Sequence, residues 1–180
     1  MRYPWRISGI LGVLLITGLR PCTRHIPEAP PVVAPMPEFQ LLTPTDQSAT
    51  KSTLKGTVWV AGFTCTSCPG PAAEVAPALS TISKLVEEHK KSIRVLAIDT
   101  QDLDPPGDWD APLGLAPGVS TALRGEESAI RSLKNQVVKI FGMKASKDWN
   151  RIFIIDPQGG LRGAYPMGDL GIDEAYHRAQ

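Results

Sequence analysis

The chain has 180 residues, which suffices for one domain with its own core, and 42% hydrophobic against 21% charged residues is the balance of a soluble globular protein. Its formal net charge of +1 argues against the basic stripe of a nucleic-acid-binding protein, so no nucleic-acid partner is expected. Nothing in the sequence indicates a coiled coil, an internal repeat or a long low-complexity region.

The first 24 residues are typical of a secretory signal or a membrane anchor. Two arginines precede a 13-residue apolar run at residues 7–19, which is shorter than the ~20 residues of a spanning helix. Cys22 follows in "LRPC" and could carry a lipid, although Arg-Pro stands where a lipoprotein signal has small residues. Because positive residues stay on the inner side, we expect an exported, membrane-tethered protein facing the periplasm or another extracytoplasmic space.

Residues 25–53 are predicted to form a proline-rich linker. Six prolines fall between residues 27 and 44, and such a sequence favours extended polyproline II over helix or sheet. The folded domain is therefore expected at 54–180.

The first predicted element of this domain is a strand at residues 57–63, "TVWVAGF", which is apolar on both faces and indicates a buried strand of a parallel sheet. A helix is predicted next, because apolar residues recur at helical spacing. They are Val75, Leu79, Ile82 and Val86. Pro77 either kinks this helix or lies in its first turn.

A second buried strand, residues 92–99, follows. The segment 100–125 contains four prolines and several glycines and is predicted to be mostly loop. Residues 126–141 return to an apolar stripe at helical spacing, with Gly142 as the expected C-cap.

A third strand is predicted at 151–156, and "PQGG" then turns the chain into a hairpin partner at 161–165. A short helix at 173–178 closes the chain. Strand–helix–strand crossovers predict parallel pairing, and the last hairpin adds an antiparallel edge. The expected fold is thus α/β and thioredoxin-like, with a central mixed sheet flanked by helices.

Cys65 and Cys68 lie between the first strand and the first helix of the domain. Such a corner is at the carboxyl edge of the sheet, where α/β folds place their sites. If the pair occupies the first helical turn, the helix N-terminus favours the thiolate. Thiolates exchange disulfides and bind soft metals, so both chemistries are candidates.

Three other readings of the pair are weaker. An inert disulfide here would close a very small loop and constrain the unfolded chain little. Zinc needs four ligands, and the one further cysteine is Cys22 in the signal region. A peroxidatic cysteine would have an upstream proline and threonine that this chain lacks.

The stretch "GFTCTSCP" resembles the Sco/SenC family of copper-handling cytochrome oxidase assembly proteins, which have Phe-Thr shortly before two cysteines and a proline directly after the second. Phe63, Thr64, Cys68 and Pro69 match this pattern. The resemblance continues through "IRVLAIDT", "TALRGEESAIRSL", "VVKIFGM" and "RIFIIDPQGGLRGAY" and covers most of residues 55–166. It implies a thioredoxin-like fold, an N-terminal membrane tether and copper ligation by the cysteines.

The chain departs from this family at two points. Two residues instead of three separate its cysteines, and the family's histidine before the third strand is missing. Asp148 stands near the matching position, and no histidine occurs between His89 and His177, which are both expected to be solvated surface residues.

The missing histidine matters because two thiolates can hold Cu(I), whereas Cu(II) prefers an added imidazole. Asp148 offers a hard oxygen and Met143 a thioether, and neither reproduces the family site. Copper at Cys65 and Cys68 is therefore possible and expected to be weakened, which leaves thiol redox work.

Thioredoxins share the Cys-x-x-Cys spacing but place a proline before the strand that faces the cysteines. Asn150 and Arg151 stand there instead, and the neighbouring Trp149 receives no role. By analogy with thioredoxin-type sites, Cys65 is expected to be the more exposed, attacking thiolate and Cys68 the resolving one.

The sequence thus predicts a tethered Sco-like protein that exchanges disulfides with a partner protein. The partner would carry a disulfide or a copper site, and a cytochrome oxidase subunit is one such protein. The alternatives are a Cu(I)-binding metallochaperone without redox turnover and a non-catalytic assembly partner with a structural disulfide.

Overall fold

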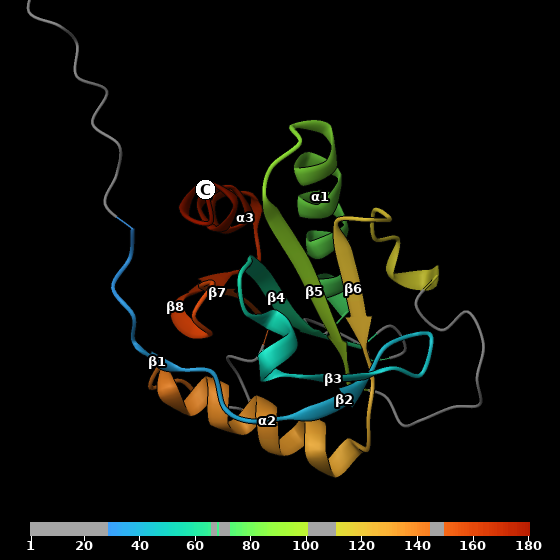
Figure 1. Cartoon of the computed structure of the whole chain (residues 1–180). Coiled ribbons are helices and arrows are strands. Elements are labelled where there is room, and N and C mark those ends of the chain that lie inside the picture. Colours follow the sequence, from blue (N-terminus) through green and yellow to red (C-terminus); the bar gives the residue numbers. More distant parts are fainter. Residues whose placement is uncertain (1–28, 66–67, 69–72, 101–110, 145–149) are drawn as a thin grey trace, which may run out of the picture.

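The computed structural model describes residues 29–65, 68, 73–100, 111–144 and 150–180. A six-stranded mixed sheet has α1 and α3 on one face and α2 on the other (Figure 1). The predicted α/β thioredoxin-like architecture is confirmed. The strands of the sheet are β1 (Ala34–Pro35), β4 (Val58–Thr64), β5 (Ile93–Asp99), β6 (Ser120–Leu123), β7 (Arg151–Ile155) and β8 (Gly160–Pro166).

The sheet runs in the order β1-β8-β7-β4-β5-β6. Strands β4, β5 and β6 are parallel, with Phe63 opposite Ile98 and Ile98 opposite Leu123. Strand β7 pairs with β4 in antiparallel orientation, and β8 pairs with β7 on its other side to form a hairpin. The carboxyl ends of three parallel strands therefore meet at one edge, where the cysteines follow β4.

Strands β4 and β5 are buried on both faces over residues 59–64 and 95–99, as predicted. Within β4, the side chain of Val60 packs in the core on the α1 side of the sheet. The side chains of Trp59, Ala61 and Phe63 pack in the core on the α2 side. Gly62 permits a close approach of α1, because a Cβ at this position would lie 2.8 Å from Val75 Cγ1.

Helix α1 (Val75–Glu88) begins at the predicted apolar stripe, with Pro77 in its first turn. There the missing N–H costs nothing, since the first turn has no intrahelical acceptor for it. The helix ends with Lys91 N–H donating to Val86 O at 3.1 Å and with Lys90 in the left-handed region at φ +49°.

Helix α2 (Glu127–Ile140) agrees with its prediction, and Gly142 caps it at φ +67°. The N–H groups of Gly142 and Met143 donate to Lys139 O and Val138 O, the two bonds of a Schellman motif. Helix α3 (Asp169–Arg178) begins four residues before the predicted start at Asp173.

The prediction of a loop over most of 100–125 is wrong for its last part. Residues Ser120–Leu123 form β6, which pairs in parallel with β5, and Ala122 and Leu123 are buried. A short 3-10 turn, η3 (Ala111–Leu113), precedes it. A four-residue strand is too short to show a period, and the prolines and glycines before it dominate the sequence signal.

The prediction that residues 25–53 stay out of any sheet, with the folded part starting at Leu54, is also wrong. Strand β1 pairs with β8, and Met36 is buried in the core on the α2 side. Pro35 is tolerated because β1 is an edge strand and the N–H groups of Val33 and Met36 on either side of it donate to Leu161 O and Gly159 O. The chain continues into β2 (Gln40–Leu42), β3 (Ser48–Thr50) and the 3-10 turn η1 (Lys51–Leu54).

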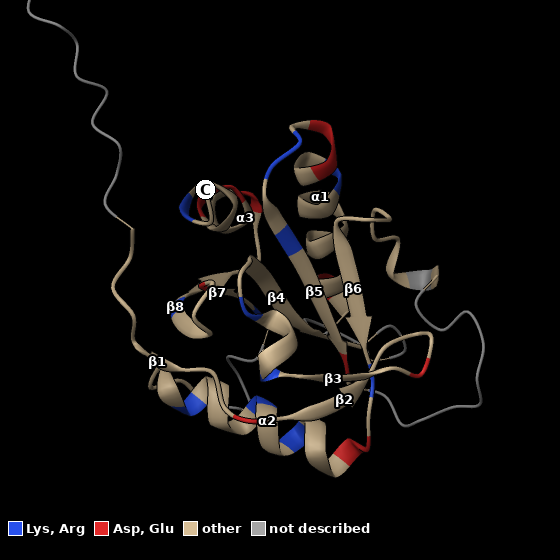
Figure 2. Ribbon diagram, in the orientation of Figure 1, with Lys and Arg blue, Asp and Glu red and all other residues tan. Residues whose placement is uncertain are grey.

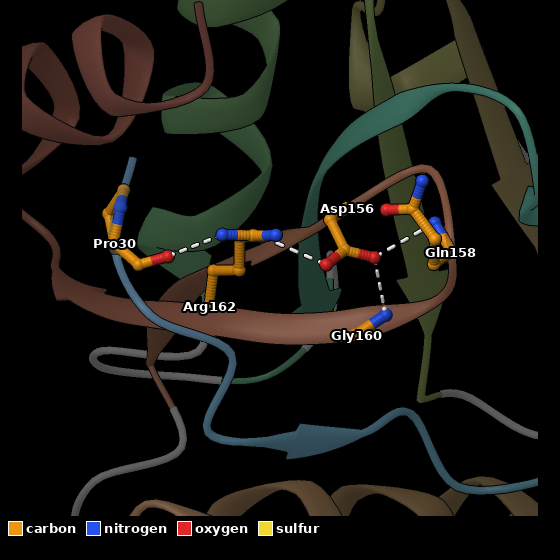
Figure 3. A network of polar contacts seen from close by, with 5 residues as sticks. All are labelled: Pro30, Asp156, Gln158, Gly160 and Arg162. Atoms are coloured by element: carbon orange, nitrogen blue, oxygen red, sulfur yellow. Dashed lines mark hydrogen bonds and ion pairs between the residues drawn. The ribbon is translucent and has the colours of Figure 1, made fainter. Parts of the chain in front are cut away.

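A polar network fastens this N-terminal segment to the β7–β8 turn (Figure 3). The buried Asp156 carboxylate accepts hydrogen bonds from the N–H groups of Gln158 and Gly160 at 2.9 and 2.7 Å. Its other oxygen accepts from Arg162 Nε at 2.8 Å, and Arg162 Nη1 donates to Pro30 O at 2.6 Å. One carboxylate thus connects the turn, β8 and the incoming chain.

In the part of the chain that the structure describes, no helix is long and apolar enough to cross a membrane. The signal or anchor predicted at 1–24 and the lipidation candidate Cys22 lie outside the described residues.

Candidate redox site

Cys65 and Cys68 are joined by a disulfide with their Cα atoms 5.3 Å apart. Cys65 follows β4 directly and is 2% exposed, whereas Cys68 is partly exposed. The structure therefore brings the two predicted site residues together and reverses their predicted accessibility. The cause is that the buried strand extends to Thr64, so that the chain is still inside the fold at Cys65.

The sequence predicts that the cysteines could occupy the first turn of a helix. In the structure, neither cysteine does so. Helix α1 begins at Val75, seven residues after Cys68 in the sequence, and Cys68 has no helical backbone. The intervening sequence contains prolines at 69 and 71. Cys68 is therefore outside the first turn of α1, where the helix dipole has its effect.

The strand end that carries Cys65 is held by Thr100. Both the backbone N–H and the side-chain hydroxyl of Thr100 donate to Thr64 O at 2.9 Å. Thr64 is fully buried, and its hydroxyl donates to Ile98 O at 3.5 Å. The peptide unit that leads into Cys65 is thus held by the residue that follows β5, with the disulfide formed.

Two buried charges accompany the cysteines at this edge of the sheet. Asp99 ends β5 opposite Thr64, and Arg124 follows β6; each is 7% exposed (Figure 2). Arg124 Nη2 donates to Asp46 Oδ1 at 2.9 Å, and its backbone exchanges two hydrogen bonds with Leu42. Neither residue is among the predicted site residues, although a polar residue at the end of a buried strand is a recognisable signal for Asp99.

The two histidines of the described residues lie away from the cysteines. Exposed His89 caps the far end of α1, with its Nδ1 2.8 Å from Tyr176 Oη, and exposed His177 lies 3.3 Å from Asp173 on α3. Both predictions of surface histidines are confirmed. Met143 packs on the α2-side core.

Asp148 and Trp149 lie outside the described residues. Within the described ranges, no three His, Cys, Asp or Glu side chains gather as a metal site. The donors that the structure brings together are therefore two sulfurs, which suit Cu(I) in the reduced form and do not make a Cu(II) site with imidazole.

Several solved structures have the same fold as this chain, and their descriptions name them as Sco proteins. BsSco, described as a member of the Sco family of cytochrome c oxidase assembly proteins with a disulfide switch, is 16% identical with a TM-score of 0.64, over 85% of this chain and 97% of its own. This is the fold of Sco proteins. The predicted resemblance to the Sco/SenC family is confirmed at this level.

Two further Sco structures agree. A SCO1/SenC family lipoprotein from Bacillus anthracis is 18% identical with a TM-score of 0.64, over 83% of this chain and 98% of its own. Yeast Sco1 with copper bound is 17% identical with a TM-score of 0.59, over 78% of this chain and 86% of its own. No protein-family model matches the sequence, and no curated protein does so significantly.

Proposed function

We propose that this Sco-like domain exchanges disulfides with a partner protein through Cys65 and Cys68. The observation that carries the proposal is the asymmetric pair at the sheet edge, with one cysteine buried on a fixed strand end and the other partly exposed. An exposed member can meet a partner's sulfur, and a buried neighbour can complete the exchange without leaving its place.

The accessibility of the pair supports an order of attack. In the reduced form, the Cys68 thiolate attacks the partner's disulfide, forms a mixed disulfide and releases one partner thiolate. Cys65 then loses its proton and attacks the Cys68 sulfur. This step forms the Cys65–Cys68 disulfide and releases the second partner thiolate, so two electrons pass to the partner. A thiol reductant resets the pair.

The partner is a protein whose cysteines must be reduced, such as a copper-site protein of the cytochrome oxidase type. The support is that the similar BsSco is described as belonging to cytochrome c oxidase assembly proteins. Residues 1–24 would tether the domain in an extracytoplasmic space, which is supported by the similarity to a lipoprotein of the SCO1/SenC family.

Copper binding is the second candidate, favoured by the copper-bound Sco1 among the similar structures. The reduced Cys65 and Cys68 would hold Cu(I) with two thiolates. Cu(II) binding is expected to be weak, because the chain supplies no histidine in the place where the family has one.

One set of measurements separates the candidates, made on the full chain carrying Cys22→Ser. Disulfide exchange predicts that Cys65→Ser, which retains Cys68, reacts with an aromatic disulfide reagent about tenfold faster than Cys68→Ser. Equal rates, or faster reaction of Cys65, would contradict the order of attack.

The reduction potential of the pair and its Cu(I) stoichiometry complete the test. A potential below about −300 mV without bound copper would indicate a structural disulfide. Stoichiometric Cu(I) together with slow exchange would favour the metallochaperone. Clear thiolate charge-transfer absorbance with Cu(II) would contradict the expectation that Cu(II) binding is weak.

A further inference from the structure

A cavity of about 230 Å³ lies on the α2 side of the sheet, and neither Cys65 nor Cys68 lines it. Its floor is formed by Trp59, Leu96 and Leu123, which come from the three parallel strands β4, β5 and β6. Its walls come from the β2–β3 hairpin, which lies next to the end of β6, and from η1, which lies by β4 (Figure 1). The cavity is therefore built by the N-terminal segment together with the sheet.

The shape of the cavity depends on small side chains and on a fixed indole. Ala49, Ser48 and Thr121 line it at places where a larger residue would fill the space. Trp59 Nε1 donates to Leu54 O at 2.8 Å, which holds the indole in the floor. A volume of 230 Å³ equals about eight water molecules at ~30 Å³ each. One aromatic ring with a short substituent has comparable size.

The lining combines an apolar floor with polar groups that are free to bind. Within the described part of the chain, the hydroxyls of Ser48 and Thr121 and the side-chain amide of Gln47 make no hydrogen bond. Among the described residues that line the cavity, none is charged. A charged ligand would therefore lose hydration without gaining a counter-charge, whereas a neutral one with a hydroxyl or amide would find partners.

We propose that this cavity binds an uncharged ligand with one aromatic ring and one hydrogen-bonding group. The ring packs on the floor beside Trp59, where aromatic pairs add to the gain from burial. The polar group of the ligand bonds to the rim at Thr121. The site is independent of the cysteine chemistry, because no lining residue belongs to the strand end that Thr100 holds.

The test uses two probes of equal size and different charge. Neutral 4-methylbenzamide and anionic 4-methylbenzoate are titrated into the full chain while the indole N–H signal of Trp59 is followed by NMR. The expected result is a saturable shift with the amide and at least about tenfold weaker binding of the carboxylate. No shift with up to 10 mM amide (roughly the weakest range of specific small-molecule binding), or equal affinities, would overturn the proposal.

Matched variants locate the binding. Thr121→Phe fills the cavity and is expected to abolish the shift, whereas Thr121→Val keeps the volume and is expected to weaken binding about fivefold by losing one hydrogen bond. Ser48→Phe at the exposed rim serves the same purpose if Thr121→Phe does not fold. Unchanged affinity in the filled variant would refute the site.

A control separates this site from the redox function. Replacing Cys65 and Cys68 together by serine is expected to leave the affinity for the amide unchanged. Loss of binding in that variant would overturn the independence of the cavity, and failure of disulfide exchange alone would leave the cavity proposal intact.

Discussion

Replacing Asp156 by alanine is expected to destabilise the fold by about 3 kcal/mol at neutral pH. The substitution leaves the N–H groups of Gln158 and Gly160 without their acceptor, at about 1 kcal/mol each. It also removes the ion pair with Arg162, whose side chain is 26% exposed, so that this pair contributes about 1 kcal/mol. The bond from Arg162 to Pro30 O then loses its support.

The contribution of Asp156 has a defined pH dependence. Burial by itself would raise the pKa of this carboxyl, but the hydrogen bonds from Gly160, Arg162 and Gln158 outweigh burial and lower the pKa below its usual range. Because the pKa is lower in the folded state, the stabilisation is fully present above the unfolded value of about 3.9. It is lost as the pH falls through the folded pKa.

Urea unfolding of the wild type and of Asp156→Ala between pH 3 and pH 7 (roughly the range on both sides of the unfolded pKa) measures both effects. Asp156→Asn is the matched control, since its amide oxygen still accepts backbone bonds while its charge is gone, and a loss of about 1 to 2 kcal/mol is expected. A loss below about 1 kcal/mol for Asp156→Ala, or a difference from the wild type that grows toward acid, would refute the reasoning.

Three further substitutions test other features. Thr100→Val removes the hydroxyl bond to Thr64 O, loosens the dithiol end of β4 and is expected to raise the reduction potential of the cysteine pair by about 20 mV in equilibration with glutathione. Thr100→Ser should leave the potential unchanged, and equal potentials in all three proteins would exclude this positioning effect. Lys90→Gly relieves a positive φ at the end of α1 and is expected to raise the urea midpoint, with a gain of about 0.5 to 1 kcal/mol. Gly62→Ala places a Cβ 2.8 Å from Val75 Cγ1 and is expected to lower the free energy of unfolding by about 1 to 3 kcal/mol; a gain in thermal stability would contradict this close packing.

The elements that the sequence predicted are those with a long period or a defined cap. Helix α2 is an example, since its apolar stripe runs for fourteen residues and Gly142 ends it in a Schellman motif. Strands β4 and β5 contain continuous apolar runs, at 58–63 and 95–98. Local sequence suffices to predict such elements because the pattern that identifies each of them lies within its own residues.

The elements that the sequence did not predict depend on distant partners. The β1 strand holds two residues, one of them Pro35, and forms because β8 offers an edge. Strand β6 is equally dependent on β5. The buried Met36 and Leu41 lie among prolines, and nothing nearby in the sequence indicates the hydrophobic surface that covers them.

The candidate site likewise has features that the sequence predicts and features that depend on distant partners. The corner position of Cys65 and Cys68 follows from a strand prediction alone. The burial of Cys65 does not, since it depends on how far β4 extends beneath its neighbours. Arg124 lies at this edge because it follows β6. Since the sequence predicts a loop in place of β6, it does not predict the position of Arg124.

The attachment of the N-terminal segment has a mechanical consequence. Its strand β1 meets β8 at Leu161, which leads through Ile155 to Trp59 at the opposite end of β4 from Thr64. Five residues of strand, about 17 Å, separate these two ends. A pulling force applied to the chain at Pro30 would therefore act first on β8 and on the turn at Asp156. The residues around the two cysteines would not carry that force.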